Sequence, residues 1–151
     1  MKHLLISACL LGLPCRYDGQ CRPLPALDTL LASFSLVPVC PEQLGGLPTP
    51  RAPAERAGVR VVTQGGQDVT DAYLYGAEQA LYLAQLFGCS AALLKARSPS
   101  CGSGQIHDGT FQGGLTAGDG VTAALLKQNG IRVYTELELD VLLRAEAGST
   151  P

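Results

Sequence analysis

The chain has 151 residues, a mass of 15.7 kDa and a formal net charge of −2 at pH 7. This length suits a single domain over residues 1–151, which would bury roughly 70% of the surface that its unfolded chain exposes. The near-neutral charge and the lack of clustered Lys and Arg disfavour polymeric nucleic acid as a partner, because binding it requires many phosphates to be neutralised.

The N-terminal segment Met1–Ala8 is apolar but too short for the hydrophobic region and cleavage site of a signal peptide. No stretch approaches the ~18 consecutive apolar residues that a membrane span needs. We therefore expect a cytoplasmic protein with no membrane partner. In a reducing compartment, the six cysteines are expected to be ligands, nucleophiles or core residues and not disulfides.

Predicted strands and helices alternate along the chain. In order, they are a strand at 4–8, a helix at 26–33, a strand at 36–39, a small ribbon of 59–62 with the turn Gly65-Gly66, a helix at 73–86, a strand at 91–94, a helix at 121–128, a strand at 131–134 and a helix at 136–145.

The helix at 73–86 is indicated by apolar residues at helical spacing, such as Ala77, Leu81 and Ala84, and by Gly88 as its end. Pro38 lacks the N–H that a central strand needs, which indicates either an edge strand or an early end of the strand. The alternation of strands and helices predicts the α/β class: a single, doubly wound, mostly parallel sheet flanked by helices, in a Rossmann-like arrangement.

Two segments are expected to be irregular. Residues 40–51 contain three prolines and two glycines, and residues 97–118 form a long connection rich in glycine. Such long connections without secondary structure are usually functional.

Cys9, Cys40 and Cys101 each lie at or shortly after the end of a predicted strand. Because the carboxyl ends of parallel strands share one edge of the sheet, thiols far apart in sequence can meet there. Thiolates bind iron–sulfur clusters, zinc and copper(I), and three protein ligands leave one position for substrate. Small buried residues at strand ends would give the same pattern, so both interpretations stay open.

The remaining cysteines are less distinctive. Cys15 and Cys21 lie in the connection after the first strand, where they are either additional ligands or bystanders. Cys89 follows a predicted helix and is expected in the core.

Cys9 and Arg16 suggest a rival chemistry. A nucleophilic cysteine and an arginine around an oxyanion are typical of low-molecular-weight phosphatases and arsenate reductases. Those enzymes have five residues between the cysteine and the arginine, whereas this chain has six, Leu10 to Cys15. The longer loop counts against a metal-free oxyanion enzyme.

Glu42 is either a catalytic residue or a solvated glutamate of a loop. Glu42 follows Cys40 by two residues, and a carboxylate beside a metal-bound substrate can act as a general base. Ser98 takes the corresponding place near Cys101. Arg51 and Arg97 flank the same segments, where they either contact a base carbonyl or a nucleotide phosphate or are surface charges.

Several long motifs resemble one family across nearly the whole chain. They are Ile6–Gly12, Cys15–Gly19, Pro38–Arg51, Ser98–Gly102, Asp68–Thr70, Gly76–Glu78 and Gly120–Leu126. The family was long catalogued as a domain of unknown function, and some of its members are thiouracil desulfidases.

This resemblance implies a [4Fe-4S] cluster bound by Cys9, Cys40 and Cys101, with the fourth iron open to the sulfur of a thiocarbonyl substrate. Glu42 and Ser98 match positions with catalytic roles in the desulfidases. The implied activity is a non-redox, hydrolytic desulfuration of 2- or 4-thiouracil, or of a related thionucleobase or thionucleotide, to the oxo product and hydrogen sulfide.

Two alternatives remain at the level of sequence. One is a non-catalytic iron–sulfur or sulfide carrier or sensor, and the other is the metal-free thiol enzyme that would use Cys9 and Arg16. The expected partner is a small thiolated base or nucleotide, and the sequence does not determine the oligomeric state.

Overall fold

The computed structural model describes residues 1–147 and is built around a parallel four-stranded sheet. Its strands are arranged in the order β2-β1-β5-β8 and comprise β1 (Lys2–Ser7), β2 (Phe34–Val39), β5 (Ala91–Leu94) and β8 (Arg132–Thr135). All three neighbouring pairs are parallel. The chain moves from β1 to one side and then returns to the other, so the strand order reverses between β1 and β5.

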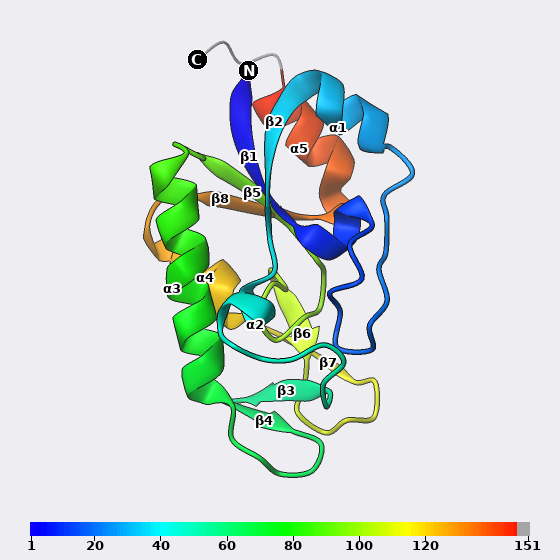
Figure 1. The fold of residues 1–151 in the computed structure, drawn as a ribbon, viewed down its shortest axis with the longest axis vertical. Helices are drawn as coiled ribbons and strands as arrows, with labels where there is room; N and C mark the ends of the chain where they lie inside the picture. The colour runs from blue at the N-terminus through cyan, green and yellow to red at the C-terminus, as the bar shows by residue number, and fades with distance from the viewer. Residues whose placement is uncertain (148–151) are drawn as a thin grey trace.

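Helices cover both faces of this sheet (Figure 1). One face carries α1 (Leu27–Ser33) and α5 (Leu139–Glu146), and the other carries α3 (Thr70–Leu86) and α4 (Val121–Gln128). Alternation along β1 builds both cores: Leu4 and Ile6 pack in one cluster with Leu30 and Leu142, whereas Leu5 packs in the other with Ala84, Ala123 and Leu126. The predicted doubly wound α/β fold is confirmed.

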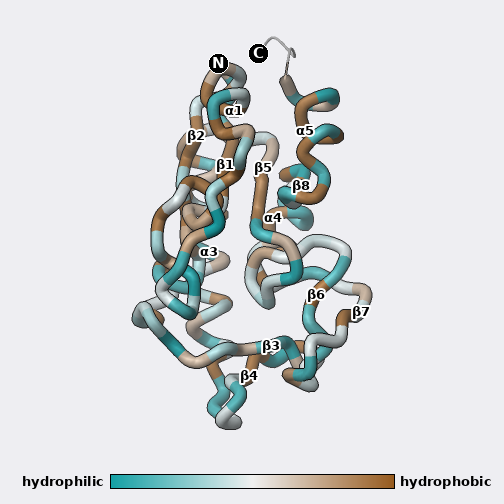
Figure 2. The backbone as a smooth tube through the Cα atoms, turned by 90° about the vertical axis from the view of Figure 1, so that its right-hand side faces the viewer, coloured by the Kyte–Doolittle hydropathy of each residue, from teal (hydrophilic) through white to brown (hydrophobic). Residues whose placement is uncertain are grey.

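The burial and sequence of the strands fit their central or edge positions in the sheet. All four residues of β5 are buried, and Figure 2 shows this central strand as a continuous apolar segment. Such runs are typical of parallel strands that are covered on both faces. Pro38 lies in β2, which is an edge strand, one of the two expected alternatives.

Two small antiparallel ribbons lie beyond the carboxyl ends of the sheet strands (Figures 1 and 2). One pairs β3 (Ala54–Ala57) with β4 (Arg60–Thr63), and the other pairs β6 (Gln105–His107) with β7 (Leu115–Ala117). The ribbon predicted around 59–62 is therefore present, but its main partner is β3. The turn Gly65-Gly66 supports only an isolated bridge between Val62 and Asp68.

Both segments expected to be irregular contain regular structure. Residues 40–51 include the short helix α2 (Pro41–Leu44), because proline is well suited to the first helical position, where its missing N–H needs no partner. Residues 97–118 include β6 and β7, whose three-residue strands are too short to give a periodic pattern.

The ends of β1 and β8 continue into 3₁₀ turns, η1 (Ala8–Leu11) and η2 (Glu136–Glu138). Cys9 therefore lies within a helical turn, and the helix predicted from residue 136 begins as a 3₁₀ turn before α5. None of the helices described within residues 1–147 has the length and apolar character to cross a membrane. The single domain over 1–151, whose last four residues lie outside the described part, and the cytoplasmic location stay predictions.

Candidate functional site

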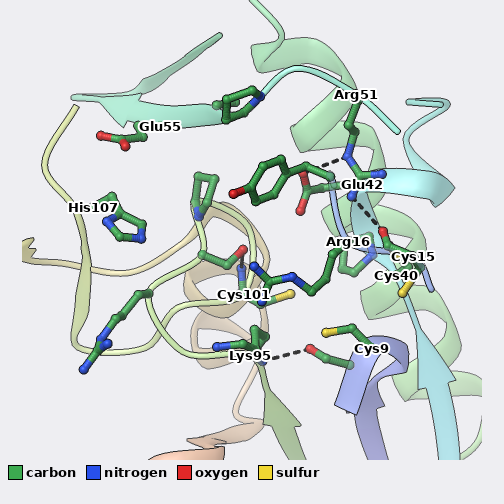
Figure 3. Close-up of a pocket in the computed structure, with 18 of the residues that line it drawn as sticks. Cys9, Cys15, Arg16, Cys40, Glu42, Arg51, Glu55, Lys95, Cys101 and His107 are labelled. Carbon is green, nitrogen blue, oxygen red and sulfur yellow. Dashed lines mark hydrogen bonds and ion pairs between the residues drawn. The ribbon is translucent and has the colours of Figure 1, made fainter. Parts of the chain in front are cut away.

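A cavity of about 440 Å³ lies between the carboxyl ends of the sheet strands and the two ribbons. This volume is typical of small-molecule sites. Its lining includes all five residues predicted for the site, namely Cys9, Cys40, Cys101, Glu42 and Ser98. The labelled cysteines and Glu42 in Figure 3 show how these side chains approach from separate elements.

The strand order explains why the cysteines meet. Cys9 follows β1 and Cys101 lies in the segment after β5, which are the two strands on either side of the reversal. Ligand sites in open α/β sheets form in the crevice outside the strand ends at this kind of switch point. Cys40 reaches the same crevice because β2 pairs with β1 on its other side.

The segment that carries Cys101 is held in one conformation. The Ser98 Oγ accepts hydrogen bonds from the N–H groups of Ser100, at 3.1 Å, and Cys101, at 3.0 Å. The first amides of α4 donate to the same segment, Val121 to the Pro99 carbonyl and Thr122 to the Ser100 carbonyl, each at 2.8 Å. The start of α4 thus supports the position of Cys101.

The cysteines that line the cavity are free, and burial acts on three of their thiols. Burial raises the pKa of Cys9 to about 11, although the positive charges of Lys95 and Arg16 oppose this shift. Burial also raises the pKa of Cys15 to about 12 and that of Cys101 above its ordinary value. Metal binding would deprotonate such thiols, because thiolates are the ligating form.

The chemistry of these donors suits an iron–sulfur cluster, because such clusters are held by cysteine thiolates. Within residues 1–147, no three His, Cys, Asp or Glu side chains lie close enough to share one metal ion. An iron–sulfur cluster has a different requirement, because each thiolate binds a different iron and the sulfurs surround a volume. Cysteines from separate elements line this cavity, and the positive charges of Lys95 and Arg16 lie near Cys9, where they would offset negative charge.

Cys15 is a fourth thiol at this cavity. It is buried and lines the cavity beside Cys40, whose Sγ donates to the Cys15 carbonyl at 3.6 Å. Cys21 is absent from the cavity lining in the described part of the chain. Cys89 is buried in the core with Ala84 and Ala92, as predicted.

Glu42 is held in place by two donors. The Tyr73 hydroxyl donates to Glu42 Oε1 at 2.5 Å, and Arg51 Nε donates to the same oxygen at 3.2 Å. The backbones of α2 and α3 approach each other closely at Gly45 and Gly76. A Cβ on Gly76 would overlap the carbonyl oxygen of Pro41, and one on Gly45 would overlap that of Ala72.

The two arginines that flank the site differ in their surroundings. The Arg51 guanidinium points into the protein and bonds to Glu42 and to backbone carbonyls. Arg97 is exposed, lines the cavity and has a φ of 68°, a left-handed conformation that is uncommon for residues other than glycine.

The loop between Cys9 and Arg16 does not provide an anion cradle. The amides of Gly12, Leu13 and Cys15 donate to carbonyls within the loop itself. An oxyanion site needs such amides to point at the ligand. This geometry, together with the raised pKa of Cys9, disfavours the metal-free thiol enzyme.

Three residues at the site were not identified from the sequence as functional. Tyr73 is the first residue of the helix predicted at 73–86, and a buried tyrosine has a hydroxyl that needs a partner. Lys95 forms an ion pair with Glu136 at 2.7 Å, and its backbone N–H donates to the Ser7 hydroxyl at 2.9 Å. Ser7 ends β1 and Lys95 directly follows β5, and neither carries a distinguishing local pattern.

Comparison with known proteins identifies the family of this chain. A family model described as 2-thiouracil desulfurase matches residues 4–138. The chain belongs to this family. Within the 2-thiouracil desulfurase family, it is similar to the uncharacterized protein YbbK of Bacillus subtilis (strain 168), with 45% identity over 150 residues that cover 93% of this chain and 99% of YbbK.

A solved structure is also similar to this chain in both sequence and fold. It is that of a [4Fe-4S]-dependent thiouracil desulfidase, TudS, which is 50% identical to this chain. The two structures superpose with a TM-score of 0.91 and cover 96% of this chain and 97% of TudS. The predicted resemblance to the thiouracil desulfidases is confirmed.

Proposed function

We propose that this protein is an enzyme that removes sulfur from a thiocarbonyl compound of the thiouracil class by hydrolysis, with a [4Fe-4S] cluster in the cavity. The supporting observation is that Cys9, Cys40, Cys101, Glu42 and Ser98 line one cavity, in a fold that superposes on TudS. The thiocarbonyl and water become the carbonyl and hydrogen sulfide, so the balanced reaction needs no oxidant or reductant.

Cys9, Cys40 and Cys101 would hold the cluster, because they are the cavity thiols that come from three separate strand ends. With only three protein ligands, a bound cluster supplies an open, thiophilic iron that acts as a Lewis acid toward the thiocarbonyl sulfur.

Glu42 would act as the general base. Both of its hydrogen-bond donors engage Oε1, and Oε2 has no hydrogen-bond partner among the described residues. Oε2 is therefore the oxygen available to take a proton from water as that water attacks the thiocarbonyl carbon. The same proton is then available to the departing sulfur, which returns Glu42 to its starting state.

Ser98 would act as a hydrogen-bond donor. A serine hydroxyl has two acceptor sites, and the amides of Ser100 and Cys101 occupy both. The hydroxyl hydrogen of Ser98 is left to donate, and it can stabilise negative charge on the substrate as water adds. In this arrangement, Ser98 does not relay the proton from water to Glu42.

The decisive experiment is sulfide release after anaerobic reconstitution with iron and sulfide, across a panel of thiolated bases, nucleosides and nucleotides. We expect turnover with at least one thiouracil derivative and a loss of about 100-fold or more in kcat for Glu42→Gln. Glu78→Gln, an exposed carboxylate change on α3, is the matched control. Fully loaded protein that releases no sulfide from any of these compounds would instead support a carrier or sensor.

A further inference from the structure

The Glu42 carboxylate is held asymmetrically, and its two donors come from different parts of the chain. We infer that Tyr73 and Arg51 are positioning residues that fix Glu42 with Oε1 bound to protein and Oε2 presented to the cavity. This inference rests on the proposed function, because it concerns the carboxylate proposed as the base.

Both donors engage one oxygen. Tyr73 donates at 2.5 Å and Arg51 Nε at 3.2 Å, each to Oε1. These two bonds fill the usual acceptor positions of that oxygen. The carboxylate in Figure 3 lies on the cavity side of Arg51, so Oε2 is the oxygen left for a water molecule.

Tyr73 is suited to be a permanent donor. Its side chain is buried with Val61, Ala77 and Val121. Burial, together with the negative charge of Glu42, raises the pKa of the Tyr73 hydroxyl far above its ordinary value. The phenol therefore stays protonated, and the ring packing that supports it is separate from the hydroxyl itself.

Arg51 is fixed by contacts other than Glu42. Its side chain is only 6% exposed. Nη1 donates to the Pro48 carbonyl at 3.2 Å and to the Thr49 hydroxyl at 3.0 Å, and Nη2 donates to the Cys15 carbonyl at 2.9 Å. Because the guanidinium is planar and rigid, these bonds determine where Nε lies.

The two donors together restrict rotation of the carboxylate. Tyr73 approaches from α3 and Arg51 from the segment after α2, so Glu42 is held between two elements. Loss of either bond would allow the carboxylate to turn and would spread Oε2 over several positions. A misplaced base slows the chemical step more than it weakens substrate binding.

Tyr73→Phe tests this inference, because it removes the hydroxyl and keeps the ring. In the reconstituted enzyme with 4-thiouracil as the probe, we expect kcat to fall about tenfold and KM to stay within about twofold, as loss of one hydrogen bond to a charged group implies. Iron content should equal that of the wild type. Tyr82→Phe removes an exposed hydroxyl from the same helix and is the matched control.

A double-mutant cycle separates positioning from a general structural role. If Tyr73 acts through Glu42, then Tyr73→Phe combined with Glu42→Gln should be no slower than Glu42→Gln alone. A crystal structure of the Tyr73→Phe apoprotein should show Glu42 in more than one side-chain conformation. This second measurement does not depend on activity.

Three outcomes would overturn the inference: wild-type kcat in Tyr73→Phe, losses that multiply in the double mutant, or a single unchanged Glu42 conformation in the variant. If the wild-type enzyme itself is inactive when loaded, the proposed function fails instead. If Tyr73→Phe does not fold, Arg51→Lys provides the test, since it keeps the positive charge but loses the planar set of donors. Unchanged kcat in Arg51→Lys would then count against positioning.

Discussion

At the scale of single residues, four thiols line the cavity, yet their settings differ. Three of them follow strands of the sheet, namely Cys9, Cys40 and Cys101. Cys15 lies in the connection after β1, and its backbone carbonyl makes its main contacts. The Cys15 carbonyl accepts from Arg51 Nη2 and from Cys40 Sγ. The backbone of Cys15 therefore holds Arg51 and Cys40 in place, and this role does not involve the Cys15 sulfur.

This difference predicts unequal effects of cysteine substitution. We expect Cys101→Ser to lose most of its bound iron after reconstitution, since a poor ligand would replace one of the three proposed ligands. We expect Cys15→Ser to load as much iron as the wild type. Iron and sulfide content and the visible absorbance of the cluster measure both, with Cys21→Ser as the control outside the cavity. A Cys15→Ser protein without a cluster would make Cys15 a ligand.

The sequence was sufficient to bring Cys9, Cys40 and Cys101 to one edge, because the parallel direction of the strands follows from their alternation with helices. It was not sufficient for Tyr73, because contact with Glu42 depends on how α2 packs on α3. The sequence also left two roles open for Arg51, contact with substrate or a surface charge. In the structure, its guanidinium donates to the carbonyls of Cys15 and Pro48, and no side-chain pattern encodes the directions of those carbonyls.

At the scale of elements, the short helix α2 determines where Glu42 lies. A helix of four residues has little stability of its own, so it depends on packing against α3. Gly45 and Gly76 allow the two backbones to approach each other. Prolines suggested a loop here, but Pro41 begins the helix instead.

Substitution at this contact should damage both stability and activity. We expect Gly76→Ala to destabilise the protein by about 2 kcal/mol, because its Cβ would overlap the Pro41 carbonyl and force α2 away. Urea unfolding of the apoprotein measures this. Glu78→Ala, an exposed change on the same helix, should shift the free energy of unfolding by less than about 0.5 kcal/mol. Equal stability of Gly76→Ala and wild type would show that α2 can move without cost.

At the scale of the whole molecule, Glu146 connects the first and last elements of the sheet region. It is 1% exposed and accepts from Lys2 at 2.9 Å, from Arg132 Nε at 2.5 Å and from Tyr134 at 2.9 Å. The Arg132 hydrogen bond, followed by those from Lys2 and Tyr134, lowers the pKa of Glu146 from 4.5 to about 2.

This lowered pKa gives the cluster a pH-dependent effect on stability. Since the folded value lies below the unfolded one, the stabilisation is complete above about pH 4.5 and is lost as the pH falls toward 2. We expect Glu146→Gln to cost about 2 kcal/mol at pH 7, less than a fully buried pair because Arg132 is partly exposed.

Thermal unfolding of wild type and Glu146→Gln between pH 2 and pH 7 tests this linkage. The difference in Tm should be largest near neutrality and should shrink as the pH falls below about 4.5. Asp140→Asn, an exposed change on the same helix, should leave a small difference that does not follow this course. A difference between wild type and Glu146→Gln that is constant with pH would contradict the assignment.

The origin of the three proposed ligands at β1, β2 and β5 has a consequence for the maturation of the protein. No two of these thiols share a local motif, so the nascent chain offers only isolated cysteines to iron. The proposed site exists only after the strands have paired, so we expect the folded apoprotein to be the species that receives a cluster. The two apolar clusters of the sheet also contain Leu4, Leu5 and other side chains that bind no metal. We therefore expect oxygen damage to a cluster to leave a folded acceptor that can be reloaded without new synthesis.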